Sequence, residues 1–159
     1  ESGRMAKGRL MLKLPILGKI NILSGAAQFA DTMSSMLSSG LTVNHAVEIT
    51  AKVMDNPVLQ EDVRSMIGRI EEGRDLSDCM RGTKYFPKNL KEMVGVGEES
   101  GSLDETLDTI AEYYHNETDL ATKAALAKLE PAIMIVLAGF AGFIVLAIYL
   151  PMFTMYNYM

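Results

Sequence analysis

Few side chains in this sequence are spaced as a catalytic or metal-binding site requires. Glu112 and His115 lie three positions apart, the Glu-x-x-His spacing that places two ligands on one side of a helix in di-iron bundles. Such a site needs a second copy of the motif on a facing helix, and the other histidine, His45, has no acidic residue three positions before it. The sequence therefore predicts no metal ion, while a metalloenzyme built on Glu112 and His115 stays open as an alternative.

Glu98 and Glu99 are the second pair whose side chains suggest acid–base chemistry. Neighbouring residues on a helix point about 100° apart, so the two carboxylates do not face one another. They stand before Ser100 and Gly101, where a helix is expected to end. We expect either a structured corner between two helices or an exposed acidic contact for a basic partner.

The pattern also argues against several other kinds of chemistry. The sequence has no GxxxxGKS or GxxxxGKT loop, so any ATP-driven work must come from a partner. His45 with Ser34, Ser35 or Cys79 suggests a base and a nucleophile, but spacing shows neither an orienting group nor an oxyanion site. Residues 21–130 are net acidic and the chain has no tryptophan, which argues against nucleic-acid binding. We expect no catalytic residue, no cofactor and no enzymatic activity.

The distribution of charge separates the chain into two parts that would position these residues. Residues 131–159 contain no charged side chain, and Ala132–Leu150 is an apolar run closed by Pro151. Its length is close to the roughly 20 helical residues that cross a bilayer core. The sequence predicts a transmembrane helix over 131–151 and a short non-cytoplasmic tail over 152–159. Small side chains in this helix form a strip on which another helix could pack closely, namely Ala138, Gly139 and Gly142.

Basic residues gather near the chain start, where residues 1–20 carry five Arg and Lys against one Glu. Basic segments beside a membrane mark its cytoplasmic side. We therefore expect a basic juxtamembrane lead-in over 1–20 and a cytoplasmic helical domain over 21–130. The single cysteine, Cys79, agrees with a reducing compartment.

Helical spacing of apolar residues, with turn signals between the runs, predicts an all-α domain. Gly40 and Gly73 are placed to end helices, and Asn56 followed by proline is placed to begin one. Thr42 and Ser77 are the expected caps of two further helices. A fifth helix is expected to run into Gly97.

The sixth helix has the sharpest start signal. Ser102 and Glu105 have the spacing of a capping box, in which each side chain accepts a hydrogen bond from the other residue's backbone N–H. Leu107, Ile110 and Tyr114 mark the face expected to be buried. No helix-breaking residue follows until Pro131, so this helix is expected to continue into the apolar run.

In their order and spacing, these segments resemble the inner-membrane platform protein family of type II secretion systems and type IV pili. The strongest element, Gly97–Leu103, reads GEESGSL and is similar to the family signature G-E-x-S-G-x-L. The other matching stretches are Lys13–Gly18, Phe29–Gly40 with Leu41–Ala46, Glu130-Pro131 and Pro151–Phe153.

The resemblance implies a six-helix cytoplasmic bundle followed by one transmembrane helix, equivalent to the C-terminal repeat and last span of a two-bundle protein. It implies a location in the bacterial inner membrane. The implied function is that of a non-enzymatic platform linking the hexameric secretion or pilus ATPase to pilin or pseudopilin assembly. Other inner-membrane assembly components and further copies of the chain are implied partners. A generic membrane-anchored helical adaptor that recruits a cytoplasmic partner is the alternative.

The resemblance also marks residues as candidate partner contacts or structural motifs. It implies that Gly101 permits a turn and that Pro131 bends the helix where it enters the membrane. Glu130 lies at the membrane edge, where desolvation of a carboxylate is costly, so we expect it to pair with Lys123, Lys128 or a basic group of a partner. The full candidate set is Glu98, Glu99, Ser100, Gly101, Glu130 and Pro131.

Overall fold

The structure, a computed structural model, describes residues 17–156 and the side chains of residues 17–153. Within that range it contains six helices and no strand, which confirms the predicted all-α fold class. Most of the predicted lead-in and the last three residues of the predicted tail lie outside the described residues. The helices are α2 (Leu17–Ser38), α3 (Val43–Val53), α4 (Pro57–Glu71), α5 (Leu76–Arg81), α6 (Lys88–Ser100) and α7 (Leu103–Tyr156).

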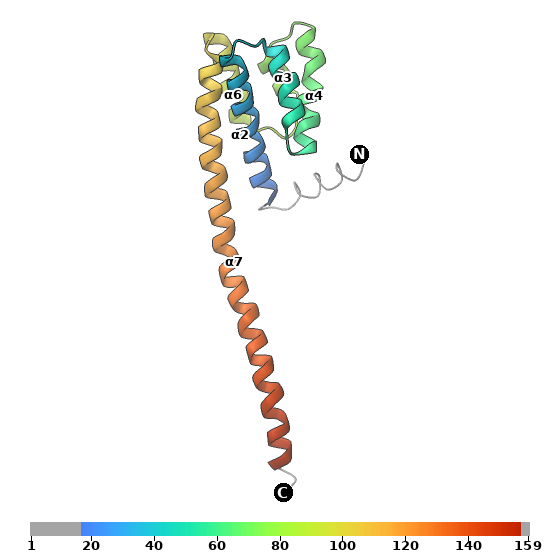
Figure 1. The fold of residues 1–159 in the computed structure, drawn as a ribbon, viewed down its shortest axis with the longest axis vertical. Coiled ribbons are helices and arrows are strands. Elements are labelled where there is room, and N and C mark those ends of the chain that lie inside the picture. The colour runs from blue at the N-terminus through green and yellow to red at the C-terminus, as the bar shows by residue number, and fades with distance from the viewer. Residues whose placement is uncertain (1–16, 157–159) are drawn as a thin grey trace. The chain divides into compact units, whose positions relative to one another are not determined.

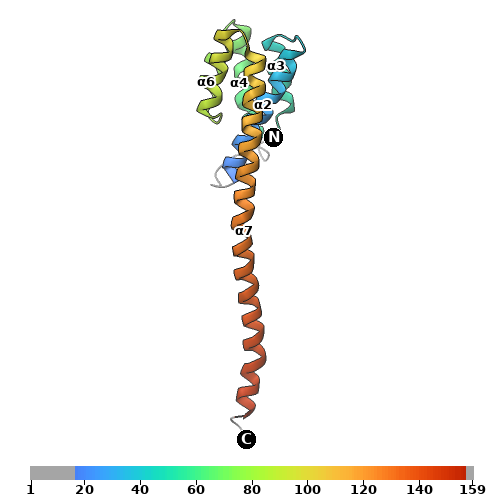
Figure 2. The same ribbon diagram turned by 90° about the vertical axis from the view of Figure 1, so that its left-hand side faces the viewer.

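The chain divides into two units, one ending at Ala121 and the other beginning at Thr122. In the first unit, α2 packs on α3 and α3 packs on α4 (Figures 1 and 2). The short helix α5 packs on α4 and on α6. The first turns of α7 contribute Leu107, Ile110 and Tyr114 to the same buried core. The ring of Phe29 on α2 lies 5.1 Å from the ring of Phe86 before α6, measured between centroids.

Several helix ends follow from adjacent residues, as the sequence predicts. Gly40 follows α2 with a φ of 84°, and the N–H of Leu41 donates to the carbonyl of Met36 at 3.1 Å. Asn56 begins α4, where its side-chain oxygen accepts the N–H of Val58 at 2.9 Å. Gly73 ends the same helix with a φ of 86°.

Three predicted helix ends are wrong in detail. Thr42 stands at the N-cap position of α3, but its side chain makes no capping hydrogen bond. Ser77 lies inside α5 rather than before it, and Asp75 occupies the N-cap position without a side-chain bond. The predicted fifth helix, α6, continues past Gly97 to Ser100, because Gly101 rather than Gly97 adopts the left-handed conformation, with φ of 71°.

The second unit consists of the later part of α7. Every side chain from Leu126 to Phe153 is exposed, and those from Ala132 onward are apolar. Among the described residues, α7 is the one helix that is long and apolar enough to cross a membrane. This part of the helix is therefore a candidate membrane span, as the sequence predicts.

Candidate functional site

The corner between α6 and α7 contains four of the predicted site residues, and the side chain of Glu98 bonds two backbone N–H groups there. Its two carboxylate oxygens accept the backbone N–H groups of Leu76 at 2.6 Å and Ser77 at 2.8 Å. These two N–H groups belong to the first turn of α5, where a helix has no carbonyl of its own to bond. Glu98 thus caps α5 from a position more than 20 residues later in the chain.

This tertiary cap has a favourable electrostatic component. The first turn of a helix carries a partial positive charge, and a carboxylate placed there is stabilised by it. Because both oxygens of Glu98 already accept hydrogen bonds, the half-buried side chain joins the end of α6 to the start of α5. Its neighbour Glu99 is exposed and makes no ion pair with another described residue.

The turn that follows is closed by backbone hydrogen bonds. The N–H of Ser102 donates to the carbonyl of Gly97 at 3.0 Å, and the N–H of Gly101 donates to the carbonyl of Glu98 at 3.3 Å. The predicted capping box is therefore wrong: the backbone N–H of Ser102 is bonded to Gly97 rather than to Glu105. The hydroxyl of Ser102 lies 2.7 Å from the hydroxyl of Ser100 instead.

Gly97 on α6 lies against the first turns of α7. A Cβ atom at this position would stand 3.0 Å from the Cβ of Thr106 and 3.1 Å from the Cα of Leu103. Both distances are shorter than ordinary carbon–carbon contacts, and one involves backbone that cannot turn away. Gly97, the first glycine of the family signature, therefore allows α6 and α7 to pack this closely.

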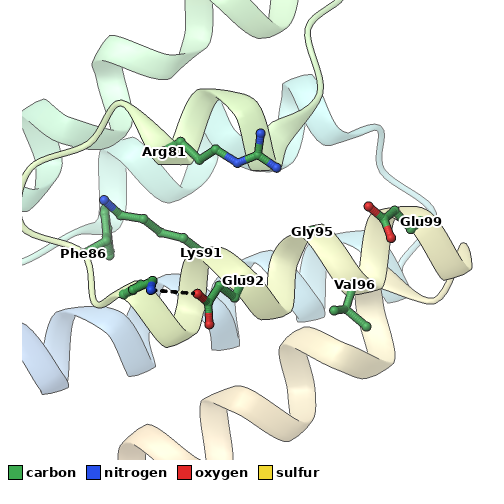
Figure 3. Close-up of a pocket in the computed structure, with 8 residues that line it drawn as sticks. Arg81, Phe86, Lys91, Glu92, Gly95, Val96 and Glu99 are labelled. Atoms are coloured by element: carbon green, nitrogen blue, oxygen red, sulfur yellow. Dashed lines mark ion pairs between the residues drawn. The ribbon is translucent and has the colours of Figure 1, made fainter.

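A cleft of about 540 Å³ opens beside this corner, between α5 and α6 (Figure 3). Arg81 extends from α5 on one side, and Gly95, Val96 and Glu99 lie along α6 on the other. Phe86, Lys88, Lys91 and Glu92 complete the lining.

Four of the charged groups that line the cleft are engaged in ion pairs or a hydrogen bond. Arg81 pairs with Asp78 at 2.7 Å, and Lys88 pairs with Glu92 at 3.4 Å. The amino group of Lys91 donates to the backbone carbonyl of Thr83 at 2.6 Å. The sequence pattern missed this cleft because two separate helices form it, and no residue spacing within one helix predicts their approach.

The remaining candidates lie in the second unit, and all of them are exposed. Glu130 makes no ion pair with Lys123 or Lys128 within the described residues. Pro131 is inside α7. A Cβ atom added at Gly139 or Gly142 would meet no other atom within 4 Å, and Ala138 is likewise exposed.

Glu112 and His115 are both exposed on the first part of α7. Among residues 17–153, no three side chains of His, Cys, Asp or Glu come together as a metal-ligand set. Cys79 is fully buried, and burial raises the pKa of its thiol above the ordinary value of 9.0. A buried thiol with a raised pKa is a poor nucleophile, so Cys79 packs in the core as an apolar group.

Comparison with known families matches residues 29–151 to "Type II secretion system (T2SS), protein F". The matched range begins within α2 and includes the rest of the bundle, the Glu98 corner and the apolar run. The chain belongs to this family. The resemblance predicted from the GEESGSL corner and the apolar helix is thereby confirmed.

Relatives within the protein F family carry two kinds of name. The type IV pilus assembly protein PilC of Myxococcus xanthus is 33% identical over 96% of this chain, and that of Pseudomonas aeruginosa is 37% identical over 94%. The type II secretion system protein F of Vibrio cholerae is 31% identical over 98% of this chain. The chain spans only 37%, 40% and 38% of the length of these relatives, respectively.

Proposed function

We propose that this chain is a non-catalytic platform component of a type II secretion or type IV pilus assembly machine, anchored in the bacterial inner membrane. The observation that carries the proposal is the single family match that runs through both the helical bundle and the apolar span. A soluble helical domain or an unrelated membrane anchor would match only one of these parts. The relatives' names come from both machines, so the proposal includes both.

In this proposal the bundle lies in the cytoplasm and contacts the hexameric secretion ATPase. The chain has no phosphate-binding loop of its own, so ATP hydrolysis is assigned to that partner. The span contacts pilin or pseudopilin subunits in the bilayer, other inner-membrane components and further copies of the chain. The helix α7 supports this division of work, because it begins in the bundle and includes the apolar run.

The Glu98 corner has an architectural role in the proposal. Glu98 fixes the start of α5 against the end of α6, and Gly97 allows α7 to cross α6 closely. The corner thereby sets the shape of the surface that a partner meets, while Glu99 remains available at that surface.

Site-specific photocrosslinking in intact cells tests the function. Probes are placed at the exposed positions His45 on α3, Glu61 on α4 and Glu112 on α7, with a further probe at Ala138 in the span. A probe at the fully buried Met66 is the matched control, because it should label only this chain.

The proposal expects bundle probes to label a cytoplasmic ATPase and the span probe to label a pilin-like subunit or another assembly component. Bundle labelling of an unrelated soluble protein, with no labelling of machine components from any position, would instead identify a general membrane-anchored adaptor.

A further inference from the structure

The exposed side of the first part of α7 carries negative charge that no described cation balances. From Leu103 to Ala121 the helix has six Asp and Glu and no Lys or Arg. None of these carboxylates makes an ion pair with another described residue. Like charges three or four residues apart on a helix repel one another, so this side of α7 is stabilised when cations lie beside it. The four exposed carboxylates are those of Glu105, Asp108, Glu112 and Asp119.

A row of apolar side chains lies next to these carboxylates. Tyr113 is 47% exposed and Leu120 is 61% exposed, although both belong to the unit that contains the core. They are seven residues apart, so they lie in one row along the helix, about 100° around the axis from Glu112 and Asp119. A segment that fits this face of α7 therefore needs both positive and apolar side chains.

The segment that precedes α2 has this composition. Residues 4–13 read RMAKGRLMLK, with four Lys or Arg, four Leu or Met and no Asp or Glu. Their four cations equal the exposed carboxylates of the α7 face in number. The segment lies outside the described residues, but α2, to which it is joined, is described from Leu17 onward.

The position of α2 brings this segment near the α7 face. The hydroxyl of Ser34 donates to the carbonyl of Asp104 at 3.0 Å, so the end of α2 lies against the start of α7. From there the two helices run in opposite directions, and the start of α2 lies beside α7 (Figures 1 and 2). Leu17 is 17 positions before Ser34 and Asp119 is 15 positions after Asp104, so the start of α2 comes level with Asp119.

We propose that residues 4–13 dock along this face of α7 in the same chain, with Lys13 near Asp119 and Arg4 toward Glu105. The cations of the segment neutralise the carboxylates, and its Leu and Met side chains cover the exposed apolar row. Because the segment is covalently joined to α2, its effective concentration at this face exceeds that of a separate basic chain. The contact lies within one chain, so the inference goes beyond the proposed function.

The lengths of the segment and of the face agree. An extended chain covers about 3.3 Å per residue, so Lys13 can lie up to about 13 Å from Leu17. From Glu105 to Asp119 the helix rises about 21 Å, at about 1.5 Å per residue. The chain from Lys13 back to Arg4 can extend over about 30 Å, so its basic side chains can be distributed along the whole face.

Cysteine crosslinking of the full chain in membranes tests the docking. Leu10→Cys with Asn116→Cys should form a disulfide within one chain under mild oxidation, detected as linked peptides from the monomer band. Asn116 is exposed and lies four residues after Glu112 and three after Tyr113, so it borders both rows. Leu10→Cys with Ser65→Cys is the matched control, since Ser65 is exposed on α4. All charges remain in place, and native Cys79 is buried in both variants.

Charge reversal gives the second measurement. Adding Asp108→Lys and Glu112→Lys to the Asn116 pair should lower the disulfide yield by about fivefold, because attractive contacts become repulsive. Adding Lys7→Glu and Arg9→Glu as well should restore the yield, since the attraction returns with its signs exchanged.

A second pair of reversals controls for net charge. Glu61→Lys with Glu71→Lys changes the net charge of the chain by the same amount, but both residues are exposed on α4 and lie away from the α7 face. This control should leave the yield unchanged. The docking further predicts that a photoprobe at Glu112 links to residues 4–13 of its own chain.

Four results would overturn the docking. Equal yields from the Asn116 and Ser65 pairs, or equal losses from the two sets of reversals, would show that the segment has no preference for the α7 face. A disulfide between two chains would place the segment on another copy. A yield that is present in phosphatidylcholine vesicles and lost in vesicles containing phosphatidylglycerol would assign the segment to the anionic lipid surface.

The docking and the proposed function can fail separately. Photocrosslinks from His45 and Glu61 to an ATPase do not depend on where residues 4–13 lie, so they would persist if the docking is wrong. A disulfide within one chain, with no label on any assembly component from those two probes, would support the docking and count against the proposed function.

Discussion

At the scale of single residues, Glu98 and Glu99 are adjacent carboxylates with different tasks. Glu98→Ala removes the acceptor for two N–H groups at the start of α5, so we expect a loss of about 1–2 kcal/mol in unfolding free energy. Glu99→Ala is the matched control and should change that free energy by less than about 0.5 kcal/mol. Denaturant titration of the full chain in detergent, followed by helical circular dichroism, measures both. Equal losses would show that the cap contributes little.

Cys79 offers a second measurement at this scale. Because burial raises the pKa of its thiol, the neutral form is favoured in the folded chain. Its contribution to stability is fully present below the unfolded thiol's ordinary pKa of 9.0 and is lost as the pH rises through the higher folded pKa. We expect Ellman's reagent to react with Cys79 only at the rate of unfolding at neutral pH. Cys79→Ala should flatten the alkaline fall in stability, and rapid labelling of the native chain would contradict this account.

At the scale of helices, the crossing of α6 and α7 depends on Gly97. We expect Gly97→Ala to lower the unfolding free energy by about 1–3 kcal/mol, because its Cβ would press on Thr106 and on the backbone of Leu103. Gly68→Ala in α4 is the control: its Cβ meets nothing within 4 Å, so it should stabilise the chain by about 0.5–1 kcal/mol. Denaturant midpoints compare the two substitutions. A stabilised Gly97→Ala variant would mean that the helices separate easily.

Helix ends show which parts of the fold were predictable. Asn56 caps α4 through a residue two positions away, so local spacing was enough to predict the start of that helix. The start of α5 depends on Glu98, which is distant in sequence, and spacing near Ser77 led to a wrong cap. At Ser102, local spacing predicted a capping box with Glu105. The turn at Gly101 instead directs the N–H of Ser102 to the carbonyl of Gly97.

At the scale of the whole molecule, the apolar run and the order of the motifs were sufficient to predict the fold class and the family. The cleft between α5 and α6 was not predictable, because the approach of Arg81 to the α6 surface is a tertiary property. The predicted roles of Ala138, Gly139 and Gly142 in helix packing and of Pro131 in bending remain predictions. The domain boundaries at 20, 130 and 151 also remain predictions.

Glu130 gives the prediction that belongs to the assembled machine. Its carboxylate is exposed and has no ion pair within the described residues, so Glu130→Gln should change the unfolding free energy by less than about 0.5 kcal/mol. We expect the same variant to capture fewer assembly components, because a carboxylate at the membrane edge requires a basic partner. Affinity purification from membranes, compared with Lys123→Gln, measures the capture. Parallel loss of stability and capture would assign Glu130 to folding.

The bond from Glu98 to the start of α5 also affects how the chain folds as it is synthesised. With six residues, α5 is too short to persist as an isolated helix in water. The N–H groups of its first turn can bond the carboxylate of Glu98 only after the ribosome has added more than 20 further residues. We therefore expect the segment to stay unformed on the ribosome until α6 has emerged. The exposed core side chains Leu76 and Met80 would then be available to chaperones during that interval.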